Sequence, residues 1–175
     1  NIHVAKCNLG RGVFASRHFV AGERILAFGG PIINCEQAMA LGHRHVNVLQ
    51  IDDDQYVDIT SPAVYLNHSC DPNAGVTQNT ILVAVRDISS GDEICFDYST
   101  TMGDGTWTMR CLCTAAHCRK FITDFQHLPP ALKHRYMSMG IVQSFLTGHS
   151  RVGLVRNPGD DCGVSLGRDR GTEEG

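Results

Sequence analysis

The sequence predicts a β-rich α+β fold made of several small, twisted sheets. Up to residue 98, apolar residues occur in short runs separated by glycine-containing turns, which is typical of short strands. Helix-forming stretches are short and are confined to one insert and to the C-terminal part. Because a doubly wound parallel sheet needs a helix between successive strands, these observations argue against that class.

Length and composition are those of one ordinary globular domain. The 175 residues are enough to bury a core, and 42% of them are hydrophobic and 19% charged. Fifteen basic against eighteen acidic residues give a net charge of −3, which argues against nucleic-acid binding and suits a basic substrate. No apolar run approaches the ~20 residues of a membrane span, and residues 1–4 do not begin a secretion signal, so we expect neither membrane insertion nor secretion.

Two corners of the β-rich part share one sequence pattern. Residues 17–25, RHFVAGERI, align with residues 86–94, RDISSGDEI. Each segment predicts a strand that ends in a turn at a glycine, Gly22 or Gly91, and a second strand that leaves the turn. We interpret the similarity as two related hairpin corners, not as a solenoid repeat.

A hairpin and three helices complete the expected elements. Residues 46–51 and 55–59 predict strands joined by an acidic run at residues 52–54. We interpret this run as a solvated turn, and attraction of a basic substrate is the alternative. Residues 35–41 predict a short helix that ends before a glycine. Two prolines introduce a second helix at residues 131–139, which also ends at a glycine, and the residues that follow it, up to Leu146, predict a third.

The N-terminal segment Gly10-Arg11-Gly12-Val13-Phe14-Ala15 literally fits the dinucleotide fingerprint Gly-x-Gly-x-x-Gly/Ala. That fingerprint requires a helix that opens at the second glycine, so that its N-terminus can bind a pyrophosphate. The residues that follow are poor helix formers and soon meet Gly22, which argues against a Rossmann fold. A bare β-turn is the stronger alternative.

Four cysteines from two distant segments predict a zinc site. Cys111, Cys113 and Cys118 follow the pattern Cys-x-Cys-x4-Cys, which supplies three of the four ligands of a tetrahedral zinc ion. Cys70 is the best candidate for the fourth, and the metal would then tie the C-terminal segment to the loop that begins at Asn67. A disulfide framework is the alternative, but Cys111 and Cys113 are too close in sequence to bridge each other comfortably.

We expect the chain to occupy a reducing compartment. The remaining cysteines show no ligand spacing, and we expect reduced thiols at Cys7, Cys35, Cys95 and Cys162. Reduced thiols indicate an intracellular location, either the cytoplasm or the nucleus.

Four segments together resemble the SET-domain protein lysine methyltransferases that carry a post-SET zinc motif. Residues 67–73 read Asn-His-Ser-Cys-Asp-Pro-Asn, the family's central signature, and residues 91–98 read Gly-Asp-Glu-Ile-Cys-Phe-Asp-Tyr, similar to its second motif. Residues 111–119 carry the post-SET cysteines and the arginine that follows them, and residues 10–15 match the N-terminal motif. The four motifs stand in the family's order and cover roughly residues 1–122.

The resemblance implies a SET-domain fold in which a loop is threaded beneath another segment, in the manner of a pseudoknot. We expect a SET domain at residues 1–100, a post-SET zinc segment at residues 101–122 and a C-terminal helical extension at residues 123–149. Residues 150–175 are rich in glycine and charge, and we expect a flexible tail there. The extension is similar to those of small stand-alone SET proteins.

The resemblance also implies the site residues. Tyr98 matches the family's catalytic tyrosine, and Phe96 and Tyr65 are expected to line a lysine channel beside it. The implied methyl donor is S-adenosylmethionine, and its expected contacts are Arg11, Gly12, Phe14, Asn67 and His68. A structural Zn²⁺ is expected on Cys70, Cys111, Cys113 and Cys118.

The expected function is methyl transfer to the ε-amine of a protein lysine. Phe96 lacks a hydroxyl that could hold a water beside the substrate nitrogen, so we expect di- or trimethyl-lysine as the product. The expected partner is a lysine-containing protein or peptide, such as a histone-like basic tail, with no nucleic acid and no membrane. A catalytically silent SET-like zinc module that binds such a peptide is one alternative, and a purely structural zinc protein is another.

Overall fold

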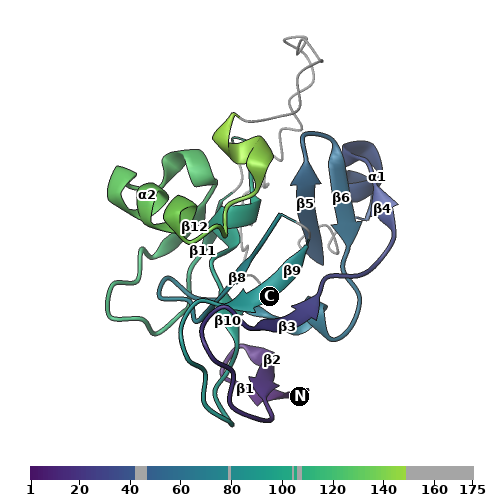
Figure 1. Cartoon of the computed structure of the whole chain (residues 1–175). Coiled ribbons are helices and arrows are strands. Elements are labelled where there is room, and N and C mark those ends of the chain that lie inside the picture. The colour runs from purple at the N-terminus through teal and green to yellow at the C-terminus, as the bar shows by residue number, and fades with distance from the viewer. Residues whose placement is uncertain (42–46, 79, 104, 106–107, 149–175) are drawn as a thin grey trace, which may run out of the picture.

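The computed structural model describes residues 1–41, 47–78, 80–103, 105 and 108–148. Within this part of the chain the strands form five small sheets, three with two strands and two with three (Figure 1). The longest described helix has nine residues, and one of the described strand pairs is parallel. The β-rich α+β class is therefore confirmed, and the described strands form no doubly wound sheet.

The N-terminal hairpin occupies the place where a dinucleotide fingerprint would need a helix. β1 (Ile2–Cys7) pairs antiparallel with β2 (Gly10–Ala15), with Ile2 opposite Ala15 and Cys7 opposite Gly10. Gly10 has a φ of +102°, which residues with a side chain rarely adopt, so it allows the chain to reverse into β2. Residues 10–15 are thus a strand, and neither a Rossmann helix nor a turn alone.

The two similar corners pack against each other, and their strands are shorter than predicted. Gly22 and Gly91 have φ values of +85° and +92°, which confirms the predicted glycine turns. Before each turn the chain forms no extended strand, and a single antiparallel bridge joins Phe19 to Ile88. Both of these side chains are fully buried, so the corners are held by core packing more than by a ladder.

Two three-stranded antiparallel sheets form the body of the domain. One consists, in order, of β3 (Arg24–Ala27), β9 (Ile81–Ala84) and β8 (Ala74–Val76). The other consists of β4 (Ile32–Ile33), β6 (Gln55–Asp58) and β5 (Val48–Asp52). β5 and β6 confirm the predicted hairpin, although Val46 lies outside the described residues. The predicted helix is α1 (Cys35–Ala40), and Asn34 and Gln37 form a capping box at its start.

The threaded loop brings the two central motifs side by side. β7 (Asn67–His68) follows the 3₁₀ turn η2 (Ala63–Tyr65) and pairs in parallel with β10 (Cys95–Phe96). Asn73 fixes the return of the loop, because its side chain accepts a hydrogen bond from the Cys95 N–H at 2.9 Å and donates one to the Glu93 carbonyl at 2.8 Å. The main core surrounds this crossing and includes Val13, Phe19, Phe28, Leu66, Leu82, Ile88, Ile94 and Phe96.

The C-terminal part adds a hairpin and a helical extension. Its elements are β11 (Thr108–Arg110), β12 (Phe121–Thr123), η4 (Phe125–His127), α2 (Pro130–Ser138) and η5 (Ser144–Thr147). α2 confirms the predicted second helix, which ends before Gly140 at a φ of +69°. The predicted third helix is wrong over residues 141–143. Gln143 is buried there and donates to the carbonyls of Val76 and Thr77, so tertiary hydrogen bonds replace helical ones.

The remaining predictions concern the C-terminal tail, the cysteines outside the zinc site and membrane insertion. Residues 150–175 and Cys162 lie outside the described residues. Cys7 and Cys95 are free thiols, as predicted, whereas Cys35 is disulfide-bonded, so the prediction of a reduced thiol is wrong there. Sequence spacing could not reveal that contact, because it depends on which segments the fold brings together. None of the described helices has the length and apolar character that a bilayer crossing requires.

Candidate active site

The Tyr98 side chain lies at the crossing of the threaded segments. Its hydroxyl donates to the Leu66 carbonyl at 2.6 Å, and its backbone N–H donates to His68 Nδ1 at 3.3 Å. Its ring centroid lies 4.9 Å from that of Phe96 and 5.3 Å from that of His68. Burial raises the pKa of the Tyr98 hydroxyl above its ordinary value, so the hydroxyl stays protonated at neutral pH. Because its hydrogen is engaged by Leu66, its oxygen is left to accept hydrogen bonds.

The other two predicted channel residues flank Tyr98 in different ways. Phe96 is 5% exposed, and its ring packs edge-on against Phe28 at 5.8 Å. Tyr65 is half-buried, and the Arg11 guanidinium lies 4.1 Å above its ring and donates to its hydroxyl at 2.9 Å. The structure therefore places Phe96 beside Tyr98 and pairs Tyr65 with Arg11.

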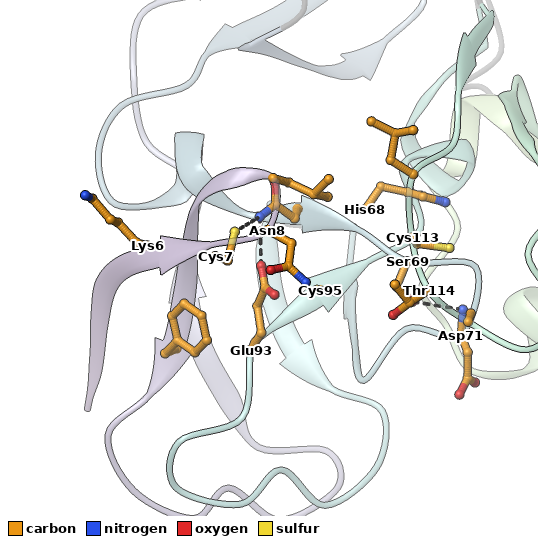
Figure 2. A pocket seen from close by; sticks show the side chains of 15 residues that line it. Lys6, Cys7, Asn8, His68, Ser69, Asp71, Glu93, Cys95, Cys113 and Thr114 are labelled. Carbon is orange, nitrogen blue, oxygen red and sulfur yellow. Dashed lines mark hydrogen bonds between the residues drawn. The ribbon is translucent and has the colours of Figure 1, made fainter.

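His68 also lines a pocket of about 500 Å³ (Figure 2). Its walls come from the β1–β2 turn, from the start of the central signature, from the segment before β10 and from residues 112–115. Of the predicted cofactor residues, Phe14, Asn67 and His68 line this pocket. Arg11 and Gly12 do not line it, because the Arg11 side chain lies over Tyr65 and Gly12 lies behind Asn67.

The side-chain amide of Asn67 has three hydrogen-bond acceptors around it. Its Nδ2 lies 2.9 Å from the Arg11 carbonyl, 2.7 Å from Glu93 Oε1 and 3.4 Å from Cys7 Sγ. A Cβ on Gly12 would lie 2.4 Å from Glu93 Oε1, so a side chain there would displace this carboxylate. Gly12 thus keeps the space in which Glu93 and Asn67 meet. Sequence reasoning gave Glu93 no role, although it stands inside the second motif.

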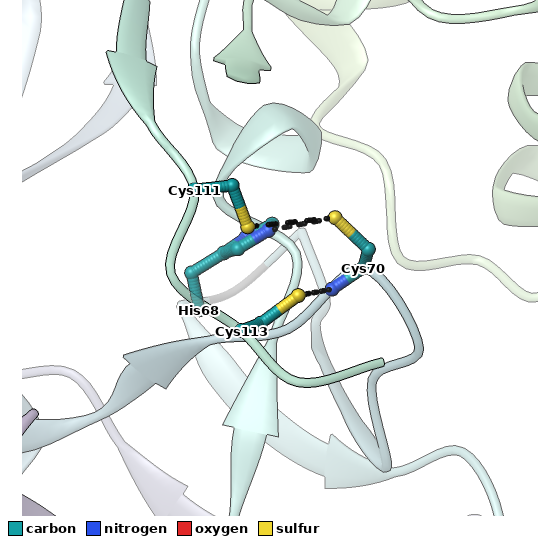
Figure 3. A group of neighbouring side chains, drawn as sticks. All are labelled: His68, Cys70, Cys111 and Cys113. Atoms are coloured by element: carbon teal, nitrogen blue, oxygen red, sulfur yellow. Dashed lines mark hydrogen bonds between the residues drawn. The ribbon is translucent and has the colours of Figure 1, made fainter. Parts of the chain in front are cut away.

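Three of the four predicted zinc ligands, Cys70, Cys111 and Cys113, gather in one cluster with His68, and Cys118 packs against the same buried group. The sulfurs of Cys70 and Cys111 are 3.7 Å apart, and the edge of a ZnS₄ tetrahedron with Zn–S bonds of about 2.3 Å is about 3.8 Å. Figure 3 shows Cys113 beside Cys70, Cys111 and His68. The thiol of Cys118 interacts with those of Cys111 and Cys113. Backbone N–H groups donate to three of the sulfurs, at 3.4 Å each, as is common around thiolate ligands: Cys70, Cys113 and Cys118.

His68 lies close to this cluster, but its hydrogen bonds argue against a role as a metal ligand. Its Nε2 is 3.3 Å from Cys70 Sγ. Because the Tyr98 N–H donates to Nδ1, the proton of the neutral ring sits on Nε2, which then donates to the sulfur and has no lone pair for a metal. Burial lowers the pKa of His68 to about 4, so the ring is neutral at physiological pH.

Residues 10–99, more than half of the chain, match the model of the SET domain family. Two relatives are from Drosophila melanogaster. Histone-lysine N-methyltransferase trr is 29% identical over 140 residues, which cover 70% of this chain and 6% of that protein. Histone-lysine N-methyltransferase Set2 is 32% identical over 130 residues, which cover 65% of this chain and 6% of that protein.

Solved structures show the same fold. KRYPTONITE in complex with mCHG DNA and SAH aligns with a TM-score of 0.56 at 24% identity, over 70% of this chain and 29% of that one. A humanized mutant of the Chaetomium thermophilum Polycomb Repressive Complex 2 bound to the inhibitor GSK126 aligns with a TM-score of 0.52 at 22% identity, over 58% of this chain and 15% of that one. The chain spans only a small part of the length of its relatives, and it belongs to the SET domain family.

Proposed function

We propose that this chain transfers methyl groups from S-adenosylmethionine to the ε-amine of a protein lysine, with di- or trimethyl-lysine as the product. The observation that carries this proposal is the position of Tyr98. Its protonated hydroxyl is fixed on the Leu66 carbonyl, and its ring packs on His68, which lines the 500 Å³ pocket. A group that can orient an amine thus lies one side chain away from a pocket of cofactor size.

The residues of the pocket fit S-adenosylmethionine. Asn67 and the backbone around His68 offer polar contacts, Phe14 and Leu112 offer apolar surface, and Glu93 supplies a carboxylate near which a cation is favoured. When bound, S-adenosylmethionine supplies a methyl group on a positively charged sulfonium. We assign Asn67, His68 and Phe14 to its binding. Gly12 acts indirectly, by leaving room for Glu93 against Asn67.

The remaining task of the site is to present a neutral lysine in line with the methyl group. With a reference pKa of about 10.4, deprotonating a lysine near pH 7 costs about 4 to 5 kcal/mol, and burial lowers that pKa. Tyr98 cannot serve as the base, because burial keeps its hydroxyl protonated. Its oxygen instead accepts an N–H from the amine and fixes the direction of the nitrogen lone pair, which is a positioning role. Phe96 borders this position without adding a polar group.

The zinc site serves structure in this proposal. Four cysteine sulfurs leave no open position on a tetrahedral ion, which is the arrangement of structural zinc. The cluster docks residues 112–115 against the threaded loop, and these residues form one wall of the pocket. Metal binding therefore completes the cofactor pocket and takes no part in the chemistry.

Histones are the proposed substrate class, because the relatives described above are named histone-lysine N-methyltransferases. The test is incubation of purified protein with isotopically labelled S-adenosylmethionine, core histones and a lysine peptide array, followed by mass mapping of the products and of the chain itself. Transfer to a lysine that the Tyr98→Phe variant does not perform supports the proposal. Peptide binding without transfer to any protein lysine would instead establish the silent SET-like module.

A further inference from the structure

The carboxylate of Asp97, which immediately precedes Tyr98, is buried and fully hydrogen-bonded. Arg119 binds it in a bidentate manner, with Nη1 2.7 Å from Oδ2 and Nη2 2.8 Å from Oδ1. The Ser99 N–H donates to Oδ1 at 3.1 Å, and the Tyr136 hydroxyl donates to Oδ2 at 2.9 Å. Each carboxylate oxygen therefore accepts two hydrogen bonds, and Asp97 is 1% exposed.

The three side chains come from three different parts of the chain. Asp97 stands at the end of the threaded core, Arg119 directly follows the cysteine segment, and Tyr136 lies on α2 of the C-terminal extension. Arg119 also reaches the cysteine cluster, because its backbone N–H donates to Cys70 Sγ at 3.4 Å. Its Nη2 lies 3.2 Å from Ser99 Oγ, one residue beyond Tyr98. We call Asp97, Arg119 and Tyr136 the buried triad.

The buried triad controls the backbone on which Tyr98 sits. A buried carboxylate that loses a partner must find another or shift position, because an unsatisfied charge in the core is costly. Asp97 cannot shift without moving Tyr98, which it adjoins, and the ring of His68, whose Nδ1 lies 3.5 Å from Asp97 Oδ1. Tyr136 is fully buried, and burial together with the charge of Asp97 raises the pKa of its hydroxyl, so it remains a donor at neutral pH.

We infer that Tyr136 is a positioning residue for methyl transfer, so that α2 of the C-terminal extension forms part of the catalytic unit. This inference rests on the proposed function. The hydroxyl of Tyr136 holds Oδ2 of Asp97 in place, and Asp97 in turn fixes the start of η3 (Tyr98–Thr101) as its cap. Tyr136 does not line the cofactor pocket, so its loss should affect the orientation of Tyr98 and leave cofactor binding intact.

Tyr136→Phe is the decisive variant, because it removes one hydroxyl and keeps the buried ring. The matched control is Leu128→Ala, which removes a buried side chain from the same apolar cluster that includes Tyr136. The hydrogen bonds described for Asp97 come from Ser99, Arg119 and Tyr136, so this control leaves them in place. The control should lower the melting temperature at least as much as the test variant, because large-to-small core substitutions leave a cavity. Rates are measured well below both melting temperatures, as kcat and as KM for S-adenosylmethionine. The affinity for S-adenosylhomocysteine is measured by calorimetry.

We expect Tyr136→Phe to lower kcat on the order of threefold to tenfold, with KM and S-adenosylhomocysteine affinity within about twofold of wild type. Leu128→Ala should retain wild-type kcat. An unchanged kcat in Tyr136→Phe, or an equal loss in both variants, overturns the inference.

A second readout does not depend on catalysis. Amide hydrogen exchange of a peptide that spans residues 95–101 should accelerate in Tyr136→Phe and not in Leu128→Ala. A wild-type protein without methyl transfer would overturn the proposed function and, with it, the positioning role of Tyr136 in that reaction. Hydrogen exchange would still report whether Tyr136 orders this segment, so the two failures are distinguishable.

Discussion

The threaded core and the cysteine segment are held in place by different forces. Around β7 and β10 the side chains are buried, with Leu66 4% and Phe96 5% exposed, and backbone hydrogen bonds join the two strands. In the cysteine segment Cys111 and Ile122 are buried, but several other apolar side chains face outwards. Leu112 is 61% and Phe121 59% exposed, and all three residues of β11 are exposed.

This difference indicates what each region depends on. The core gains its stability from apolar burial, which requires no ligand. The cysteine segment has only a small buried cluster, around Cys111 and Ile122, so its position depends more on the sulfur cluster and on the Arg119–Asp97 ion pair. Since residues 112–115 form a wall of the pocket, the weaker region carries part of the site. Loss of the metal should therefore remove function before it removes the fold.

Removal of the metal should have the largest effect and tests the comparison directly. We expect Cys113→Ser to lose bound zinc and all detectable methyl transfer while the β-sheet circular dichroism and most of the unfolding transition remain, because the core does not contain the cluster. Elemental analysis, rates and thermal unfolding measure the three quantities. Cys95→Ser is the control for metal content, since Cys95 lies outside the cluster and burial raises the pKa of its thiol to about 12. Active protein without zinc, or a Cys111–Cys118 disulfide, would contradict the assignment.

Removal of the Tyr98 hydroxyl should have the next largest effect, and it probes the core alone. In Tyr98→Phe the amine loses its acceptor, and the loss of one preorganised hydrogen-bonding group costs about 10²- to 10³-fold in kcat. The affinity for S-adenosylhomocysteine should stay within about twofold, because the hydroxyl faces Leu66 and not the pocket. Initial rates and calorimetry separate the two quantities. Turnover close to that of wild type would remove the central mechanistic claim.

Truncation of Asn67 should weaken S-adenosylmethionine binding in the pocket between the threaded core and the cysteine segment. Asn67→Ala removes a pocket-lining amide that is hydrogen-bonded to the Arg11 carbonyl and to Glu93, and it leaves Glu93 without this donor. We expect S-adenosylmethionine affinity to fall about tenfold, as for the loss of a hydrogen bond to a charged or buried group, with a smaller change in kcat at saturation. An unchanged dissociation constant for S-adenosylhomocysteine would exclude Asn67 from the cofactor site.

Local patterns predicted much of this molecule, and long-range pairings limited the rest. The turns at Gly22 and Gly91 are local signals, and the structure has both. The cysteine spacing is also a local signal, and the structure gathers Cys111 and Cys113 with Cys70. The side chain of Arg11, by contrast, lies over Tyr65, 54 residues away, and no local pattern encodes that contact. The helix predicted at Gln143 likewise does not form there, because the Gln143 side chain donates hydrogen bonds to carbonyls 66 and 67 residues away.

Long-range contacts also explain why the sequence did not predict some of the site residues. Glu93 and Asp97 stand inside a motif, but their roles follow from partners elsewhere in the chain. Tyr136, which lies 39 residues from Asp97, carries no motif at all. An acidic residue between two aromatic ones, as in Phe96-Asp97-Tyr98, was the available signal that a buried carboxylate needed partners.

The smallest effect is expected on the number of methyl groups that the enzyme adds, and it concerns the buried ring of Phe96. Phe96 is 5% exposed, and its ring packs against those of Phe28 and Tyr98. Its side chain has no hydroxyl that could anchor a water near the substrate nitrogen. We expect the wild-type enzyme to reach di- or trimethyl-lysine and Phe96→Tyr to shift it towards monomethyl-lysine. One ordered water and its hydrogen bonds contribute on the order of 1 to 2 kcal/mol, enough for roughly tenfold discrimination.

Phe28→Tyr is the matched control for this last change, because it adds the same hydroxyl to a neighbouring ring that packs against Phe96. Its product distribution should remain that of wild type. The hydroxyl of Tyr65 accepts a hydrogen bond from Arg11 at 2.9 Å, and it retains its own hydrogen as a donor. Mass spectrometry of a good peptide substrate under excess S-adenosylmethionine decides the matter. If wild-type product stopped at monomethyl-lysine, a group other than Phe96 would set the limit, and the comparison would then have to include Tyr65 as a wall of the lysine channel.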